Sequence, residues 1–129
     1  ALVRSRMAWI DRYAFRAMIG VYYGVDPDRI EAACDRLQQA LAEMGSWTAE
    51  TGWLAGDGVT LADAVAIPIH VRMTGLQRLG FTADLPPAWV AHGERCVELA
   101  GWPAVEWSPA QTDEFVGRFE SHRRVQRRR

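Results

Sequence analysis

The chain has 129 residues and a formal net charge of -1, a length that fits one domain. Hydrophobic residues make up 49% and charged residues 24%, proportions typical of a globular protein with a substantial core. No apolar run approaches a membrane span and no secretory signal opens the chain, so we expect a cytoplasmic protein without membrane contact.

The first two predicted helices are amphipathic and are separated by a turn at Gly24. One apolar stripe of the first helix consists of Val3, Met7, Ile10, Ala14, Ala17, Met18 and Val21. Asp26 caps the second helix, with Pro27 at its first position. Its apolar face consists of Ile30, Ala33, Cys34, Leu37, Leu41 and Met44.

The third predicted helix begins at Thr60 with a capping box. The Thr60 hydroxyl can accept a hydrogen bond from the Asp63 N–H, and the Asp63 carboxylate can accept one from the Thr60 N–H. Both residues are therefore predicted to be structural N-cap residues. The helix is almost wholly apolar, so we expect residues 61–76 to be innermost, with a kink at Pro68.

Two further helices are predicted in the C-terminal part of the chain. The fourth begins at Pro87, and its inward residues are predicted to be Trp89, Val90, Gly93, Cys96, Val97 and Ala100. Ser108 and Gln111 form the capping box of the last helix. This helix can pack against the rest of the bundle through Phe115, Val116 and Phe119. The pattern predicts an all-α bundle of at least five helices without strands.

The charge is distributed unevenly along the chain. From Arg118 to the end, six Arg and one Glu give +5, which leaves -6 for the remainder of the net charge of -1. Such a cluster can bind nucleic acid, but no aromatic residue is interleaved with these arginines, so nucleic acid is not the expected partner. We interpret residues 121–129 as a solvated, frayed tail after a single domain over residues 1–120.

The sequence contains no recognisable catalytic or metal motif. There is no Gly-rich phosphate loop, no HExxH and no paired-cysteine motif. His70, His92 and His122 are scattered, and His70 is interpreted as a hydrogen-bonded core residue. Cys34 and Cys96 have no metal-ligand spacing and are predicted to be buried free thiols. We therefore assign no catalytic residue and no metal ligand.

The segment from Trp53 to Asp63 is the most specific part of the chain. Its Trp-Leu-x-Gly-Asp-x-x-Thr-x-x-Asp pattern resembles the segment that opens the core helix in the C-terminal domain of glutathione S-transferases, with its fixed elements at Trp53, Leu54, Gly56, Asp57, Thr60 and Asp63. Residues 6–15 and 102–105 also resemble stretches of bacterial members. The resemblance covers about residues 1–107.

The resemblance implies the helical half of a bacterial glutathione transferase. In that family, a thioredoxin-like N-terminal domain binds glutathione and carries the catalytic residue, so this chain alone is expected to be inactive. The intact protein would conjugate glutathione, its co-substrate, to a small electrophile. The family also implies a homodimer through the first two helices, where aromatic residues exceed what the core stripe needs: Trp9, Tyr13, Phe15, Tyr22 and Tyr23.

Trp9, Tyr13 and Arg16 are the candidate substrate-pocket residues. They are spaced four and three residues apart and so share one helix face, offset from the core stripe. An aromatic, hydrogen-bonding and cationic row suits a pocket for apolar or anionic substrates, although amphipathic surface or interface packing would use the same residues. The alternative to an enzyme domain is a non-catalytic dimerisation or docking module of the same fold.

Overall fold

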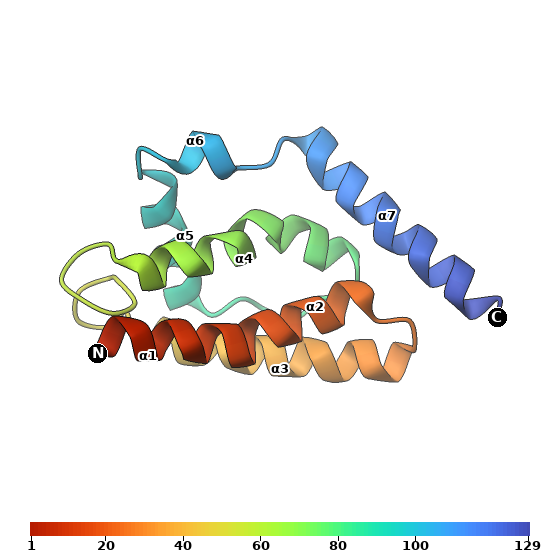
Figure 1. Cartoon of the computed structure of the whole chain (residues 1–129), viewed down its shortest axis with the longest axis horizontal. Helices are drawn as coiled ribbons and strands as arrows, with labels where there is room; N and C mark the ends of the chain where they lie inside the picture. Colours follow the sequence, from red (N-terminus) through yellow and green to blue (C-terminus); the bar gives the residue numbers. More distant parts are fainter.

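The computed structural model describes residues 1–129 and contains helices and turns but no β-strand (Figure 1). In chain order the helical segments are α1 (Leu2–Trp9), η1 (Ile10–Phe15), α2 (Arg16–Tyr23), α3 (Pro27–Ser46), α4 (Leu61–Arg78), α5 (Pro87–Val97), α6 (Trp102–Val105) and α7 (Pro109–Arg127). The segments α1, η1 and α2 follow one another without a break and form the single predicted first helix, in which η1 is π-helical. The prediction of an all-helical bundle is confirmed.

The first helix and α3 lie side by side along one edge of the molecule (Figure 1). The first helix ends because Gly24 adopts an extended conformation, with φ -61° and ψ 145°. Asp26 caps α3 by accepting a hydrogen bond of 2.8 Å from the Asp28 N–H. The two predicted apolar faces meet in the core, except that Val3 and Met7 are only partly buried.

Helix α4 crosses the middle of the molecule, and only one of its faces is fully covered. Its buried residues are Ala62, Asp63, Ala66, Ile69, Met73, Gly75 and Leu76. Leu61 is 65% exposed and Ala64 is exposed, so the expectation that the whole of residues 61–76 is innermost is wrong. The apolar residues on the other face are covered only in part because the short α6 and the diverging α7 leave it open (Figure 1). No helix of the chain combines the length and the hydropathy that a membrane span requires.

Helix α5 packs through a narrower face than the sequence predicts. Trp89 and Cys96 are buried as expected, but Val90 is 40% and Val97 48% exposed. His92, which the pattern did not place inward, is completely buried. It lies one turn from both Trp89 and Cys96, so the buried face follows the spacing of three and four residues.

Helix α7 returns to the body of the molecule through aromatic contacts. The Ser108–Gln111 capping box is present, and Phe115, Val116 and Phe119 are buried as predicted. Tyr22 lies against Phe115 and Phe119, with ring centroids 5.2 and 4.7 Å away. These contacts hold α7 against α2 and α4.

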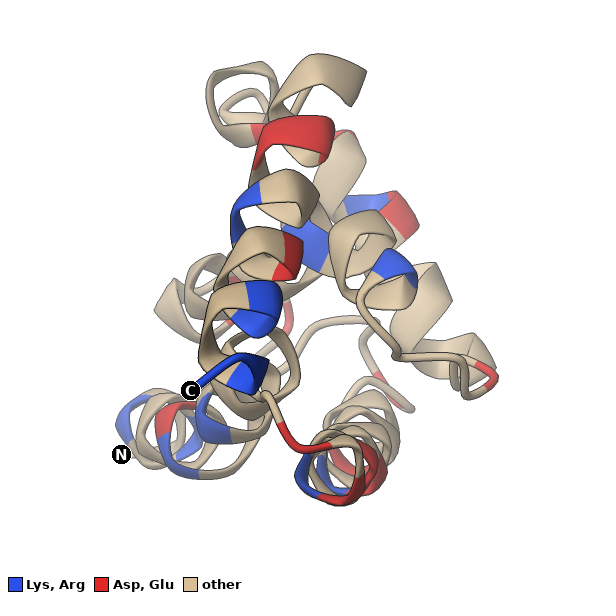
Figure 2. Cartoon of the chain, turned by 90° about the vertical axis from the view of Figure 1, so that its right-hand side faces the viewer, with Lys and Arg blue, Asp and Glu red and all other residues tan.

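The basic C-terminal segment differs from the expected frayed tail. Helix α7 continues to Arg127, and its C-terminal end lies beside the turn between α2 and α3 (Figure 2). Arg123 donates to the carbonyl oxygens of Val21 and Gly24, and Arg127 donates to that of Val25. The last carbonyls of a helix lack intrahelical partners, so guanidinium groups are well suited to this position.

Gly75 is predicted to be required where α4 meets α7. A Cβ at this position would lie 2.7 Å from Phe115 Cδ1, closer than atoms can pack. Overpacking of this kind costs about 1–3 kcal/mol, so Gly75→Ala should lower the denaturant midpoint. The matched control is Gly117→Ala on α7, where a Cβ meets nothing within 4 Å and helix propensity favours Ala by about 1 kcal/mol. Equal effects of the two substitutions on the midpoint would contradict the packing.

Candidate functional site

The capping box that begins α4 is present in both directions. The Asp63 Oδ2 atom accepts a hydrogen bond of 2.8 Å from the Thr60 N–H, and Thr60 Oγ1 accepts one of 3.3 Å from the Ala62 N–H. The structure therefore places both predicted N-cap residues at the helix N-terminus, where a carboxylate also interacts favourably with the helix dipole.

Asp63 does more than cap α4, because its second oxygen reaches two other parts of the chain. Oδ1 accepts a hydrogen bond of 2.9 Å from the Leu54 N–H and one of 2.8 Å from His92 Nε2. Burial raises the pKa of Asp63, but the hydrogen bonds from His92, Leu54 and Thr60 outweigh burial, and the pKa lies below its ordinary value. The carboxylate is thus an ionised acceptor that joins the turn before α4 to α5.

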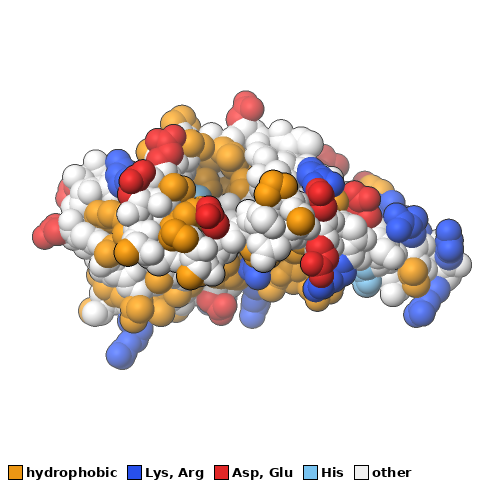
Figure 3. Space-filling view, turned by 90° about the horizontal axis from the view of Figure 1, so that it is seen from above, with side chains coloured by type: hydrophobic (Ala, Val, Ile, Leu, Met, Phe, Trp, Pro, Cys, Tyr) orange, Lys and Arg blue, Asp and Glu red, His pale blue; other side chains and the backbone are white.

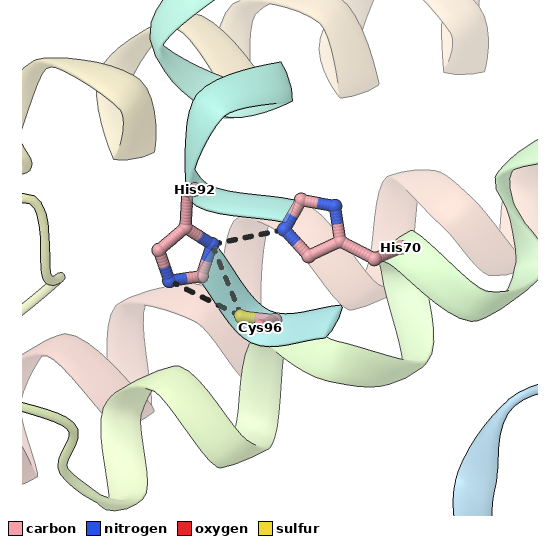
Figure 4. A group of neighbouring side chains, drawn as sticks. All are labelled: His70, His92 and Cys96. Carbon is pink, nitrogen blue, oxygen red and sulfur yellow. Dashed lines mark hydrogen bonds between the residues drawn. The ribbon is translucent and has the colours of Figure 1, made fainter. Parts of the chain in front are cut away.

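His92 and His70 are hydrogen-bonded to each other, so the interpretation of the histidines as scattered is wrong for this pair. His92 Nδ1 lies 2.9 Å from His70 Nε2, and Figure 4 shows the two rings facing each other from α5 and α4. Burial lowers the pKa of His70 to about 3, and the neighbouring His92 adds to the effect. Trp89 stacks on His70, with ring centroids 3.8 Å apart, and fixes the plane of its ring.

Cys96 completes this buried polar cluster, which consists of Asp63, His70, His92 and Cys96. Its Sγ lies 3.8 Å from each ring nitrogen of His92 (Figure 4). The order Cys96, His92, Asp63 superficially suits a nucleophile, a base and an orienting carboxylate. However, Cys96 is fully buried, and burial together with the charge of Asp63 raises the pKa of its thiol to about 12. The thiol is therefore neither ionised nor accessible to a substrate, and we exclude a nucleophilic role.

Trp9, Tyr13 and Arg16, the three predicted pocket residues, line one cleft between the first helix and α3. The cleft has a volume of about 450 Å³, and its other lining residues are Arg12, Ala17, Arg36, Gln39 and Ala40. Trp9 also packs edge-on against Trp47, with ring centroids 4.9 Å apart. Three guanidinium groups and no carboxylate line this cleft, which gives it a cationic and aromatic character.

A second, more apolar cleft lies between the open face of α4 and α6. It has a volume of about 590 Å³. Its apolar lining includes Ile67, Pro68 and Val71 from α4 and Trp102 and Val105 from α6, and its single charged residue is Arg72. Figure 3 shows hydrophobic side chains gathered on this side of the molecule. The sequence did not predict this cleft, because a helix that is apolar on every side is expected to be covered on every side.

The polar cluster could have been found only in part from the sequence. His92 and Cys96 are four residues apart on one predicted helix, which places them on the same face. Nothing in the sequence pairs that face with His70 and Asp63, because this contact joins residues 22 and 29 positions apart. Cys34 and Cys96 are both buried and free, as predicted.

Comparisons with known proteins do not identify the chain. No family model matches it, and no curated protein matches it.

Asp63 is predicted to contribute more to stability than a helix cap alone. Thr60→Ala removes a cap and should cost about 0.5–2 kcal/mol. Asp63→Ala also leaves His92 Nε2 and the Leu54 N–H buried without an acceptor, and each buried donor without a partner costs about 1–3 kcal/mol. Urea denaturation of the two variants measures the difference. Equal losses for Thr60→Ala and Asp63→Ala would show that the contact with His92 adds no stability.

Proposed function

We propose that this chain is the helical domain of a glutathione-transferase-like protein and forms one wall of its electrophile pocket. The observation that supports the proposal most directly is the cleft lined by Trp9, Tyr13 and Arg16, which combines aromatic surface with positive charge. The catalytic residue and the glutathione site would lie in a thioredoxin-like domain outside this chain. The intact protein would then conjugate the glutathione thiolate to a small electrophile.

The geometry around Asp63 gives a physical reason for the spacing in the family-like segment. Leu54 and Asp63 are nine residues apart, and the Leu54 N–H donates directly to the Asp63 carboxylate. The Leu54 carbonyl in turn accepts a hydrogen bond from Arg6 of the first helix. The segment thus folds back on the N-terminus of its own helix and is fastened to the helix that carries the cleft. The nine-residue spacing of Leu54 and Asp63 in the Trp53–Asp63 pattern therefore has a structural role, and this supports the proposal.

The chemistry of the cleft favours an aromatic substrate that carries a negative charge. Arg12, Arg16 and Arg36 take part in none of the ion pairs of the structure, so their guanidinium groups are available to an anion. Arg12 also lies over the Tyr13 ring, 5.5 Å from its centroid. An aromatic ring can stack on Trp9 and Tyr13 while its acidic group contacts the arginines.

Binding of an anionic aromatic dye tests this cleft. We expect anilinonaphthalene sulfonate to bind the chain. The affinity of the dye for the double variant Arg16→Gln/Arg36→Gln should be about fivefold lower, since each exposed charge contributes up to about 1 kcal/mol. Arg29→Gln, on α3 but outside the cleft, is the control. Circular dichroism verifies that each variant is folded. Identical dye affinities for the double variant and the control would exclude this cleft as the binding site.

The second candidate is a non-catalytic dimerisation or docking module of the same fold. Exposed hydrophobic side chains on the first helix favour it: Tyr13 is 47%, Ile19 42% and Tyr23 53% exposed. Tyr22, in contrast, is buried against α7 and is not available to a partner. Both candidates share a homodimer through the first two helices, and the coding sequence that precedes Ala1 discriminates between them.

Self-association is predicted to depend on the exposed residues of the first helix. Sedimentation velocity over a range of concentrations should show a reversible dimer, and Ile19→Glu should shift it to monomer because a charge at an interface must be desolvated. Val97→Glu is the control, since Val97 is similarly exposed, at 48%, but lies on α5. A strict monomer at the highest concentration, or dissociation by the control alone, would count against this interface.

A further inference from the structure

His70, His92 and Cys96 bring three potential metal ligands together from two helices. His70 projects from α4, whereas His92 and Cys96 project from successive turns of α5 (Figure 4). One ligand atom from each of the three side chains lies within 4.8 Å of the other two. This cluster is separate from both clefts described above, and neither cleft includes any of its residues.

The spacing of the cluster approaches that of a tetrahedral metal site. Bond lengths of 2.0–2.1 Å to nitrogen and about 2.3 Å to sulfur give edges of about 3.3 Å between two nitrogens and about 3.6 Å between nitrogen and sulfur. The corresponding distances here are 2.9 Å from His70 Nε2 to His92 Nδ1 and 3.8 Å from His92 Nδ1 to Cys96 Sγ. These two edges need to change by less than half an ångström. The third edge, between His70 and Cys96, lies within 4.8 Å and must shorten by up to about 1.2 Å as the side chains rotate.

The Asp63 carboxylate selects the ring nitrogen of His92 that can bind a metal. Because Asp63 Oδ1 also accepts a hydrogen bond from the Leu54 N–H, it acts as an acceptor, and His92 Nε2 donates the hydrogen bond of 2.8 Å between them. The other nitrogen, Nδ1, faces His70 Nε2 at 2.9 Å, lies 3.8 Å from Cys96 Sγ and can offer its lone pair to the metal. A carboxylate that accepts from the far nitrogen of a metal-binding histidine is the usual arrangement around zinc.

The charges of the cluster compensate a buried divalent ion. Metal binding displaces the proton of the Cys96 thiol, which passes to the solvent, and the hydrogen between the two rings moves to His70 Nδ1. The thiolate and the Asp63 carboxylate then supply two negative charges against the two positive charges of the ion. His70 is partly exposed, so the ion can enter from the His70 side, and a water molecule can occupy the fourth position.

We propose that His70, His92 and Cys96 form a binding site for a thiophilic divalent metal ion of the zinc type, with Asp63 as the carboxylate that orients His92. Two imidazoles and one thiolate suit zinc and exclude magnesium or calcium, which prefer oxygen ligands. The proposal is independent of the proposed transferase function, because it rests on a cluster inside the bundle rather than on a cleft.

Cobalt titration of the chelator-treated full chain tests the site. We expect one Co²⁺ per chain, with the visible absorption of tetrahedral cobalt and a thiolate-to-cobalt charge-transfer band that stoichiometric Zn²⁺ removes. Cys96→Ala should abolish the charge-transfer band and weaken cobalt binding at least tenfold, while Cys34→Ala, at the other buried free thiol, should leave both unchanged. The absence of the charge-transfer band in the parent protein, or its retention in Cys96→Ala, would overturn the proposal.

Thermal unfolding of a second pair of variants keeps the proposal testable if Cys96→Ala does not fold. Zn²⁺ should raise the Tm of the parent protein, because a ligand that binds only the folded state stabilises it. The increase should be lost in His70→Gln and retained in His122→Gln, whose histidine lies on α7. An equal increase in these two variants would place the metal elsewhere and refute the site.

Discussion

The buried, ionised carboxylate of Asp63 is the group on which the arrangement of this bundle depends. It accepts hydrogen bonds from the Leu54 N–H, the Thr60 N–H and hydroxyl, and His92 Nε2. A charge in the protein interior is tolerated only when its lone pairs are satisfied, so these partners must all be in place together. One side chain therefore fixes the turn before α4, the first turn of α4 and the position of α5.

The position of α5 depends on the hydrogen bond between Asp63 and His92. The helix has no side-chain N-cap, and two of its valines are exposed. Its fixed points are Trp89, His92 and Cys96, and each of them lies in or against the polar cluster around Asp63. Apolar packing alone would allow a helix with so narrow a buried face to rotate or slide. Directional hydrogen bonds between His92, His70 and Asp63 select one orientation.

The surfaces left open by the bundle differ in chemistry because different elements leave them uncovered. The first helix and α3 place arginines and aromatic rings around a cleft, and no carboxylate neutralises them. On the other side of α4, the short α6 leaves an apolar cleft with Arg72 as its only charged residue. Helix α7 does not cover this face, because Phe115 and Phe119 hold it against α2 and its terminal arginines bind the end of the first helix. The two clefts therefore suit different ligands, one anionic and one apolar.

The sequence by itself determined the helices, their caps and most of their buried faces, because these features depend on residues within one or two turns of each other. The Thr60–Asp63 and Ser108–Gln111 capping boxes, the Asp26 cap and the apolar stripes of the first helix and α3 are all of this local kind. The sequence also placed Trp9, Tyr13 and Arg16 on one face, since helical spacing alone brings them together. Only the tertiary structure decided that Arg36 joins them, that one face of α4 stays open and that the C-terminal arginines bind the carbonyls near Gly24. The same holds for His92, which meets His70 and Asp63 across the bundle: contacts between distant segments depend on how whole helices pack, and no local pattern encodes them.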